Sequence, residues 1–348
     1  MKIGTLLNYS GDYVAAIDEV VALEKAGLDA VWVPEAYSFD AVTVMGFLAA
    51  RTETVEIGSG ILPVYTRTPT LLAMTAAGLD ALTGGRAVLG LGASGPQVIE
   101  GFHGVEYDAP LGRTRETIEI CRQVWRREKV DFHGKYYDVP LPEGQGTGLG
   151  KSLKLINHPV RSDIPILVAS LGDKNVEMTA ELANQWLPIW FWPERSRQVW
   201  GDALDAGMAK RDPALGQLDI IAGASVAIGD DVEHMRDFAR PMAALYFGGM
   251  GAKGKNFYNN VLQRYGFEAE AEEIQNLYLS GHKDEAAALI PDELLSSSSL
   301  IGSEGFVKDR LRAMADAGVT YLNISPLAST TAEKVAIVER LKAMIADL

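Results

Sequence analysis

The sequence predicts an α/β fold, a single (β/α)8 barrel. Apolar, strand-like runs alternate with amphipathic helical segments along the chain, eight such units can be counted, and the last strand lies close to the C-terminus. Strands joined by helices are mostly parallel, with right-handed crossovers. An open, doubly wound sheet would alternate in the same way. The closed barrel is favoured because the pattern fills all 348 residues.

The first four units follow one another closely. The predicted strands cover residues 2–8, 29–35, 55–63 and 86–95, and the predicted helices cover residues 12–27, 41–52, 69–85 and 113–128. In the first helix Val14, Ile17 and Val21 lie near one face, and Gly27 ends it.

The second half repeats the unit after an interruption. The predicted strands cover residues 165–170, 184–190, 217–229 and 319–325, and the predicted helices cover residues 173–183, 194–211, 305–318 and 331–348. Two insertions interrupt this order. The first, near residues 130–160, begins with a β-hairpin expected to turn at His133–Gly134 and continues as a Gly-rich loop. The second, residues 231–300, is predicted to be helical throughout. We expect residues 1–348 to form one domain.

Composition limits the possible functions. The net charge is −14, from 46 acidic and 32 basic residues, so binding to a nucleic acid is not expected. No run of about 18 apolar residues predicts a membrane span, and the N-terminus lacks a signal-peptide pattern, so we expect a cytoplasmic protein. The single cysteine, Cys121, has helical spacing to Ile118 and Trp125 and reads as a buried core thiol. The five histidines lack metal-ligand spacing, so no metal site is expected.

Two glycine-containing loops are candidates for binding a phosphate or a flat ring. In a barrel, function sits on the loops that follow the strands. Gly90, Gly92 and Gly95 follow the fourth strand and allow close approach of the backbone. Ser170–Asn175 follows the fifth strand, at the start of a helix whose N–H groups could bind an anion. A simple turn and an ordinary helix cap explain these two loops equally well.

Two carboxylates follow the second strand. Glu35 and Asp40 stand where general acid–base chemistry would be placed. Asp40 also fits the N-cap of the next helix, and either residue could be a solvated loop charge.

Four segments together resemble the luciferase-like monooxygenase superfamily. They are residues 31–69, 82–97, 164–175 and 318–329. They are most similar to its F420-dependent branch, which includes methylenetetrahydromethanopterin reductase and F420-dependent glucose-6-phosphate dehydrogenase. The resemblance implies an oxidoreductase that transfers a hydride between the deazaflavin F420 and a small organic substrate.

The resemblance also implies roles for particular residues. Gly60–Ile61 would form a non-prolyl cis peptide against the deazaflavin ring. Asp40, with Glu35 as the second choice, would be the acidic residue near the ring and the candidate catalytic group. The phosphate end would be held by the loops at Gly92–Gln97 and Ser170–Asn175, whose candidate residues are Gly92, Ala93, Ser94, Gly95, Gln97, Ser170, Leu171, Gly172 and Asn175.

The alternatives differ in cofactor and in chemistry. The methanopterin reductases carry a glutamate near the end of strand one, where this chain has Leu6, Leu7 and Asn8, which speaks against the pterin reaction. An FMN-dependent luciferase-like monooxygenase is the second choice, disfavoured because no arginine lies beside either phosphate loop in the sequence. A non-catalytic flavin- or deazaflavin-binding homologue is the third choice. The substrate cannot be read from the sequence.

The helices after strands two and three predict a homodimer. Residues 41–50 and 69–79 are apolar on nearly all sides, which is typical of helices buried on more than one face. The superfamily commonly pairs through this region.

Overall fold

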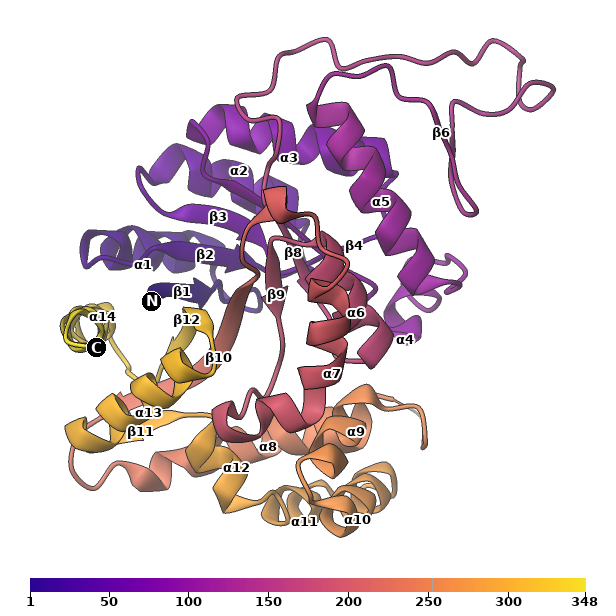
Figure 1. Cartoon of the computed structure of the whole chain (residues 1–348). Coiled ribbons are helices and arrows are strands. Elements are labelled where there is room, and N and C mark those ends of the chain that lie inside the picture. The colour runs from indigo at the N-terminus through magenta and orange to yellow at the C-terminus, as the bar shows by residue number, and fades with distance from the viewer. Residues whose placement is uncertain (252) are drawn as a thin grey trace.

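The eight predicted strands form one closed parallel barrel in the computed structural model, which describes residues 1–251 and 253–348 (Figure 1). β12 pairs with both β1 and β10, and β10 also pairs with β9, so the sheet has no gap. The predicted barrel is therefore confirmed and the open sheet is excluded. The barrel strands are β1 (Lys2–Leu6), β2 (Ala30–Val33), β3 (Glu56–Ser59), β5 (Ala87–Gly92), β8 (Ile166–Ala169), β9 (Gln185–Leu187), β10 (Asp219–Ile228) and β12 (Val319–Pro326).

Helices surround the barrel at the predicted places. Several begin at a side-chain cap: Asp12 accepts hydrogen bonds from the N–H groups of Val14 and Ala15, and Thr330 forms a capping box with Glu333. The surrounding helices are α1 (Tyr13–Lys25), α2 (Ala41–Arg51), α3 (Pro69–Thr83), α4 (Pro96–Ile99), α5 (Pro110–Trp125), α6 (Asp173–Leu182), η1 (Pro193–Arg195), α7 (Ser196–Met208), η2 (Pro213–Leu215), α13 (Glu304–Asp316) and α14 (Thr331–Ala346).

Two apolar layers hold the barrel together. Outward-facing strand residues such as Ile3, Ile57 and Leu322 pack against the helices, and Cys121 is buried among them, as predicted. A smaller inner cluster surrounds Trp32, which is fully buried inside the barrel near Tyr321. Side chains alternate along a strand, so the residues that follow Trp32 and Tyr321 at even spacing also point inward.

The insertion near residues 130–160 contains the predicted hairpin. β6 (Phe132–His133) pairs antiparallel with β7 (Asp138–Val139), and Figure 1 shows this segment projecting from the barrel. The predicted turn position is wrong by a few residues: His133 pairs with Asp138, and the chain turns over residues 134–137, where the N–H of Gly134 donates to the carbonyl of Tyr137.

The second insertion is mostly helical, as predicted. Its elements are η3 (Glu233–Ala239), α8 (Arg240–Ala244), the π-helical turn η4 (Leu245–Gly249), α9 (Phe257–Arg264), α10 (Glu268–Leu279), α11 (Lys283–Ala288) and α12 (Asp292–Ser297). These helices lie together beside the barrel (Figure 1) and share one hydrophobic cluster with α6, α7 and β9. A short strand, β11 (Leu300–Gly302), follows and pairs with β10, which the sequence did not predict. That residues 1–348 form one domain stays a prediction.

No helix in the described ranges is both long and apolar enough to cross a bilayer.

Candidate functional site

The carboxyl-end mouth of the barrel is open above Trp32. Inward-facing residues at this end are exposed or half-buried: Leu6 of β1, Ala169 of β8, Leu187 of β9 and Gly223 of β10. A Cβ added at Gly223 would meet a single atom within 4 Å, the carbonyl oxygen of Asn323 at 3.9 Å. The inward-facing side chains at this end therefore leave open space beside Gly223.

The segment after β3 forms one wall of the mouth. The Gly60–Ile61 peptide bond is cis, as predicted. Beyond it β4 (Leu62–Pro63) pairs with β5. A Cβ at Gly92 would come within 2.8 Å of the Ile61 side chain, so only glycine at position 92 lets Ile61 lie this close to β5. A glycine on β5 and a bulky residue between β3 and β4 therefore build this wall together.

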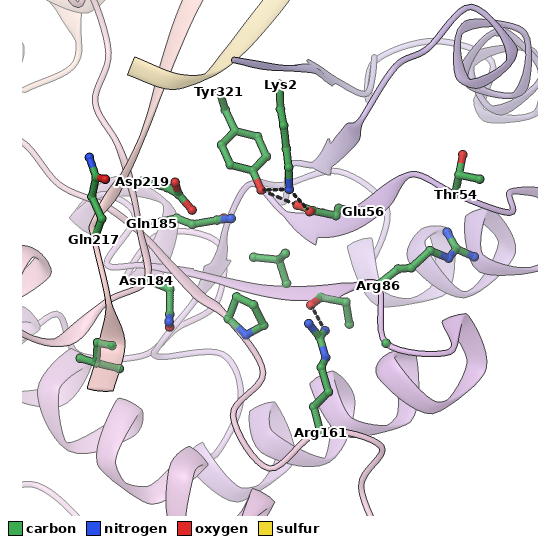
Figure 2. Close-up of a pocket in the computed structure, with 15 residues that line it drawn as sticks. Lys2, Thr54, Glu56, Arg86, Arg161, Asn184, Gln185, Gln217, Asp219 and Tyr321 are labelled. Atoms are coloured by element: carbon green, nitrogen blue, oxygen red, sulfur yellow. Dashed lines mark hydrogen bonds and ion pairs between the residues drawn. The ribbon is translucent and has the colours of Figure 1, made fainter. Parts of the chain in front are cut away.

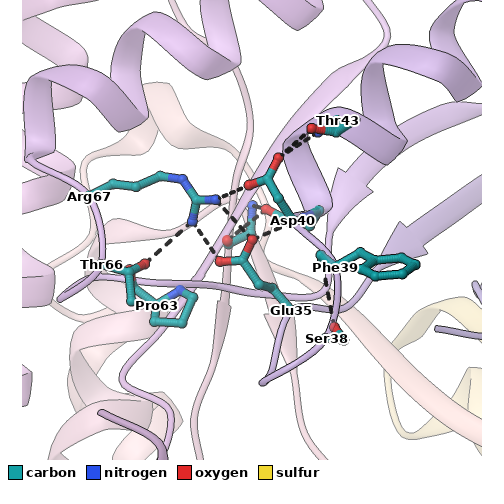
Figure 3. A network of polar contacts seen from close by, with 11 residues as sticks. Glu35, Ser38, Phe39, Asp40, Thr43, Pro63, Thr66 and Arg67 are labelled. Carbon is teal, nitrogen blue, oxygen red and sulfur yellow. Dashed lines mark hydrogen bonds and ion pairs between the residues drawn. The ribbon is translucent and has the colours of Figure 1, made fainter. Parts of the chain in front are cut away.

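Glu35 and Asp40 are joined by an arginine that the sequence reading did not single out. Arg67, in the loop after β4, donates to both Glu35 carboxylate oxygens at 2.6 and 2.9 Å and to Asp40 at 2.5 Å (Figure 3). Glu35 also accepts from the N–H of Ala41 at 3.0 Å. Its side chain is 6% exposed, against 47% for Asp40. The Glu35 side chain is thus buried among its partners, whereas the Asp40 carboxylate has an open edge, meaning that part of it is exposed to solvent.

Asp40 is also the N-cap of α2. Its second oxygen accepts from the N–H and the hydroxyl of Thr43, both at 2.8 Å. Partial burial opposes ionisation of the carboxyl, but the hydrogen bonds from Thr43 and the charge of Arg67 hold the pKa of Asp40 below its ordinary value. At neutral pH Asp40 is therefore a carboxylate, which can accept a hydrogen bond or a proton and cannot donate one.

The loop after β5 leads directly into α4. Ser94 has a left-handed backbone, with φ of 57°, and Gly95 is the N-cap of α4, without a side-chain hydrogen bond. Tyr107 donates its hydroxyl to the Ser94 carbonyl at 3.3 Å. Backbone N–H groups in this loop remain available for an anion.

In the loop after β8, backbone N–H groups are more accessible to a ligand than the Ser170 hydroxyl is. The Ser170 hydroxyl is buried and hydrogen-bonded to the hydroxyl of Thr179 at 2.8 Å. Gly172 begins α6, again without a side-chain cap, so the first N–H groups of this helix lack a side-chain partner. Arg264 of α9 pairs with Asp173 at 2.6 Å beside this helix end. The prediction that no arginine lies beside either predicted phosphate loop is therefore wrong. Arg264 belongs to α9, far along the chain, and lies beside the loop after β8 in the folded structure.

A buried polar atom inside the barrel makes no hydrogen bond to the described residues. The side-chain oxygen of Asn323 has no hydrogen-bond partner among the described residues. Asn323 lies on β12 opposite both Gly4 and Gly223, at an inward-facing position. An amide oxygen beside an open, glycine-lined space suits a flat ring that carries N–H groups.

The opposite end of the barrel also has a pocket, of about 420 Å³ (Figure 2). There Lys2 donates to Glu56 at 2.5 Å and to Tyr321 at 2.8 Å, and Tyr321 donates to Glu56 at 2.8 Å. The amino end of such barrels supports stability and the carboxyl end carries the chemistry. The candidate active site is therefore placed at the mouth and not in this amino-end pocket.

Comparison with known proteins agrees with this architecture. A Mycobacterium tuberculosis protein whose name provisionally assigns it as a coenzyme F420-dependent oxidoreductase is 42% identical over 330 residues, covering 93% of this chain and 95% of that protein. The structure of the F420-dependent tetrahydromethanopterin reductase from Methanopyrus kandleri matches with a TM-score of 0.78 at 22% identity, covering 99% of this chain and 98% of that one. The oxygenating constituent of 3,6-diketocamphane monooxygenase from Pseudomonas putida, solved with FMN, has a TM-score of 0.66 at 18% identity, covering 100% of this chain and 98% of that one.

The resemblance that the sequence predicted is confirmed. The family model described as luciferase-like monooxygenase matches residues 1–321, which include all the barrel-mouth residues described above except Asn323. The chain belongs to the luciferase-like monooxygenase family.

Proposed function

We propose that this protein is an F420-dependent oxidoreductase that transfers a hydride between the deazaflavin and a small organic substrate. The observation that carries the proposal is the open barrel mouth, which is bordered by the segment between β3 and β4 and by the two loops that precede α4 and α6, helices without side-chain caps. The 42% identical relative bears the name of such an enzyme. When bound, F420 supplies two-electron hydride chemistry, and the protein contributes binding and orientation.

The residues present fit this cofactor. The ring would lie against Gly60, Ile61 and Asp40, next to the unpartnered oxygen of Asn323. The phosphate end would be held by two loops, through Gly92, Ala93, Ser94, Gly95 and Gln97 after β5, and through Ser170, Leu171, Gly172 and Asn175 after β8. Since the Ser170 hydroxyl is committed to Thr179, the second loop would bind through backbone N–H groups and the Asn175 side chain.

The two carboxylates take different roles in this proposal. Asp40 has an open edge and is the candidate catalytic group, acting as an ionised carboxylate toward the ring or the substrate. Glu35 was the second candidate from the sequence. Both of its oxygens are occupied, by Arg67 and the N–H of Ala41, so we assign it a positioning role that acts through Arg67.

Titration with the two cofactors tests this function. Purified protein should bind F420 and not FMN, as followed by the absorbance or fluorescence change of each compound added separately. Reduced F420 should then be oxidised by members of a panel of compounds with C=O, C=N or electron-poor C=C groups. Binding of FMN alone would refute the cofactor assignment and leave the family standing. Binding of F420 with no turnover in either direction would favour the non-catalytic homologue.

We also propose a homodimer that forms through α2 and α3, in a protein located in the cytoplasm. An apolar hollow of about 250 Å³ lies between these helices, lined by Val42, Met45, Gly46, Met74, Thr75, Gly78, Leu79 and Leu82. Leu82 is 73% exposed and Met74 is 53% exposed. An exposed apolar patch on two neighbouring helices is typical of a protein interface.

Charge introduced into this hollow should separate the subunits. Met74→Asp and Leu82→Asp should each shift the mass measured by light scattering from a dimer to a monomer, because an aspartate cannot be buried there unpaired. Leu149→Asp is the matched control. Leu149 lies away from α2 and α3, in the insertion near residues 130–160, and its side chain is 83% exposed. A wild-type protein that is monomeric at micromolar concentration would contradict the proposal.

A further inference from the structure

One segment of the helical insertion, described for residues 245–251 and 253–264, contacts loops at the carboxyl end of the barrel. These loops follow different barrel strands. The Phe247 ring packs on Trp190, after β9, with centroids 5.5 Å apart. A Cβ at Gly172, after β8, would lie 3.3 Å from the Phe257 ring. This segment therefore borders the loop after β8, which is part of the proposed cofactor site.

Two tyrosines in this segment are fixed by one buried side chain. Asn256, 1% exposed, donates to the carbonyls of Tyr246 and Phe247 at 2.9 and 3.0 Å, and its side-chain oxygen accepts from the N–H of Tyr258 at 2.9 Å. Tyr246 stands in the π-helical turn η4, a conformation that recurs at functional sites. The Tyr246 and Tyr258 rings meet edge to face, with centroids 4.8 Å apart and planes at 80°.

The hydroxyl groups of this pair have no partner within the described residues. Neither hydroxyl makes a hydrogen bond there, and neither is among the fully enclosed polar atoms, although both side chains are half-buried. Tyr9, after β1, is among the titratable groups around Tyr246, and Tyr107, after β5, is among those around Tyr258. Residues of these two loops therefore belong to the surroundings of the pair.

These phenols are hydrogen-bond donors at neutral pH. Burial, with the neighbouring hydroxyls of Tyr246 and Tyr107, raises the pKa of Tyr258 to about 12. Burial, with the nearby Tyr9, also raises the pKa of Tyr246. Both side chains therefore keep their protons in the range where the enzyme would work. Two unpartnered donors at an active-site mouth suit an oxygen atom that gains negative charge.

We propose that the hydroxyls of Tyr246 and Tyr258 bind the substrate oxygen, and that the substrates are aldehydes or ketones and the corresponding alcohols. This inference rests on the proposed function, with reduced F420 as the hydride donor. As the hydride bonds to the carbonyl carbon, the C=O π pair moves to the oxygen. The oxygen takes the proton of one tyrosine, and water returns a proton to that tyrosine. Alcohol oxidation by oxidised F420 is the reverse.

Tyrosine-to-phenylalanine variants test the pair. Tyr246→Phe and Tyr258→Phe should each lower kcat/KM for a responsive aldehyde or ketone by about 10–100-fold, and the double variant should lose more. The Kd for F420 and the Tm should stay at the wild-type values. Tyr136→Phe, in the β6–β7 hairpin, is the matched control and should not change kcat/KM.

The outcomes separate the inference from the function on which it rests. If the wild type does not bind F420, both fail. The pair is excluded if F420 binds but both single variants keep wild-type kcat/KM on carbonyl compounds. The substrate class is excluded if F420 binds and the only compounds reduced contain C=C or C=N groups, or if no aldehyde or ketone is reduced.

Discussion

Replacing Asp40 by asparagine should lower turnover with F420 by about 10²-fold or more, with little change in stability. Asparagine caps a helix about as well as aspartate, so the bond from the N–H of Thr43 survives. The negative charge at the open edge of the Glu35–Arg67–Asp40 network is lost (Figure 3). The measurement is kcat and KM for oxidation of reduced F420, together with a urea unfolding curve.

Two further variants separate the roles of Asp40. Asp40→Ala removes the cap as well and should cost about 1 kcal/mol of stability beyond its effect on turnover. Asp212→Asn is the matched control, because Asp212 also caps a helix, η2. It lies before β10, at the amino end of the barrel, so turnover should stay unchanged. If Asp40→Asn keeps full turnover, Asp40 is a helix cap and no more.

The low pKa of Asp40 sets the pH range of its contribution. Because the folded-state pKa is lowered, the ion pair with Arg67 is complete above the ordinary carboxyl pKa and is lost only as pH falls through the folded value. Protonation of Asp40 should therefore produce no step in a pH–rate profile near neutrality. A step there that disappears in Asp40→Asn would contradict this assignment.

Replacing Asp80 by alanine should destabilise the fold by about 3–5 kcal/mol, because it leaves a partly buried cation without its anion. Asp80 is fully buried near the end of α3. It accepts from Nε of Arg161, 3.1 Å from each oxygen, and from the N–H of Ala87 at 3.2 Å. Arg161 also lines the amino-end pocket and donates to the Ala87 carbonyl at 2.6 Å (Figure 2). The pair ties the loop before β8 to the start of β5.

Urea unfolding of Asp80→Ala against the wild type measures this loss. Asp205→Ala is the control: it breaks the surface pair of Asp205 with Arg197, whose side chains are 63% and 67% exposed, and should change the unfolding midpoint little. Equal, small effects of both variants would show that burial does not strengthen the Asp80 pair. F420 binding by any folded Asp80→Ala protein should be preserved, since Asp80 lies at the end opposite the mouth.

The sequence by itself determined the barrel and the position of the loops in which the site is proposed. Strand and helix periodicity are local properties of the chain, so all eight barrel strands could be placed before the structure was known. Gly92 ends β5 and Gly172 is the N-cap of α6, so both stand where the sequence pattern changes from strand to helix. The cis bond at Gly60–Ile61 came from the family resemblance, because nothing in its own residues indicates it.

Only the tertiary structure decided which side chains meet. Arg67 stands 27 residues after Asp40 and 32 after Glu35, and the closing of β2 and β3 into one barrel brings the three together. Tyr246 and Tyr258 belong to an insertion whose sequence gives its helices but not the side of the barrel on which they pack. The hydroxyl of Ser170 is hydrogen-bonded to Thr179 of α6, because the helix packs back onto the end of β8. Such contacts depend on distances between segments far apart in sequence, which periodicity cannot encode.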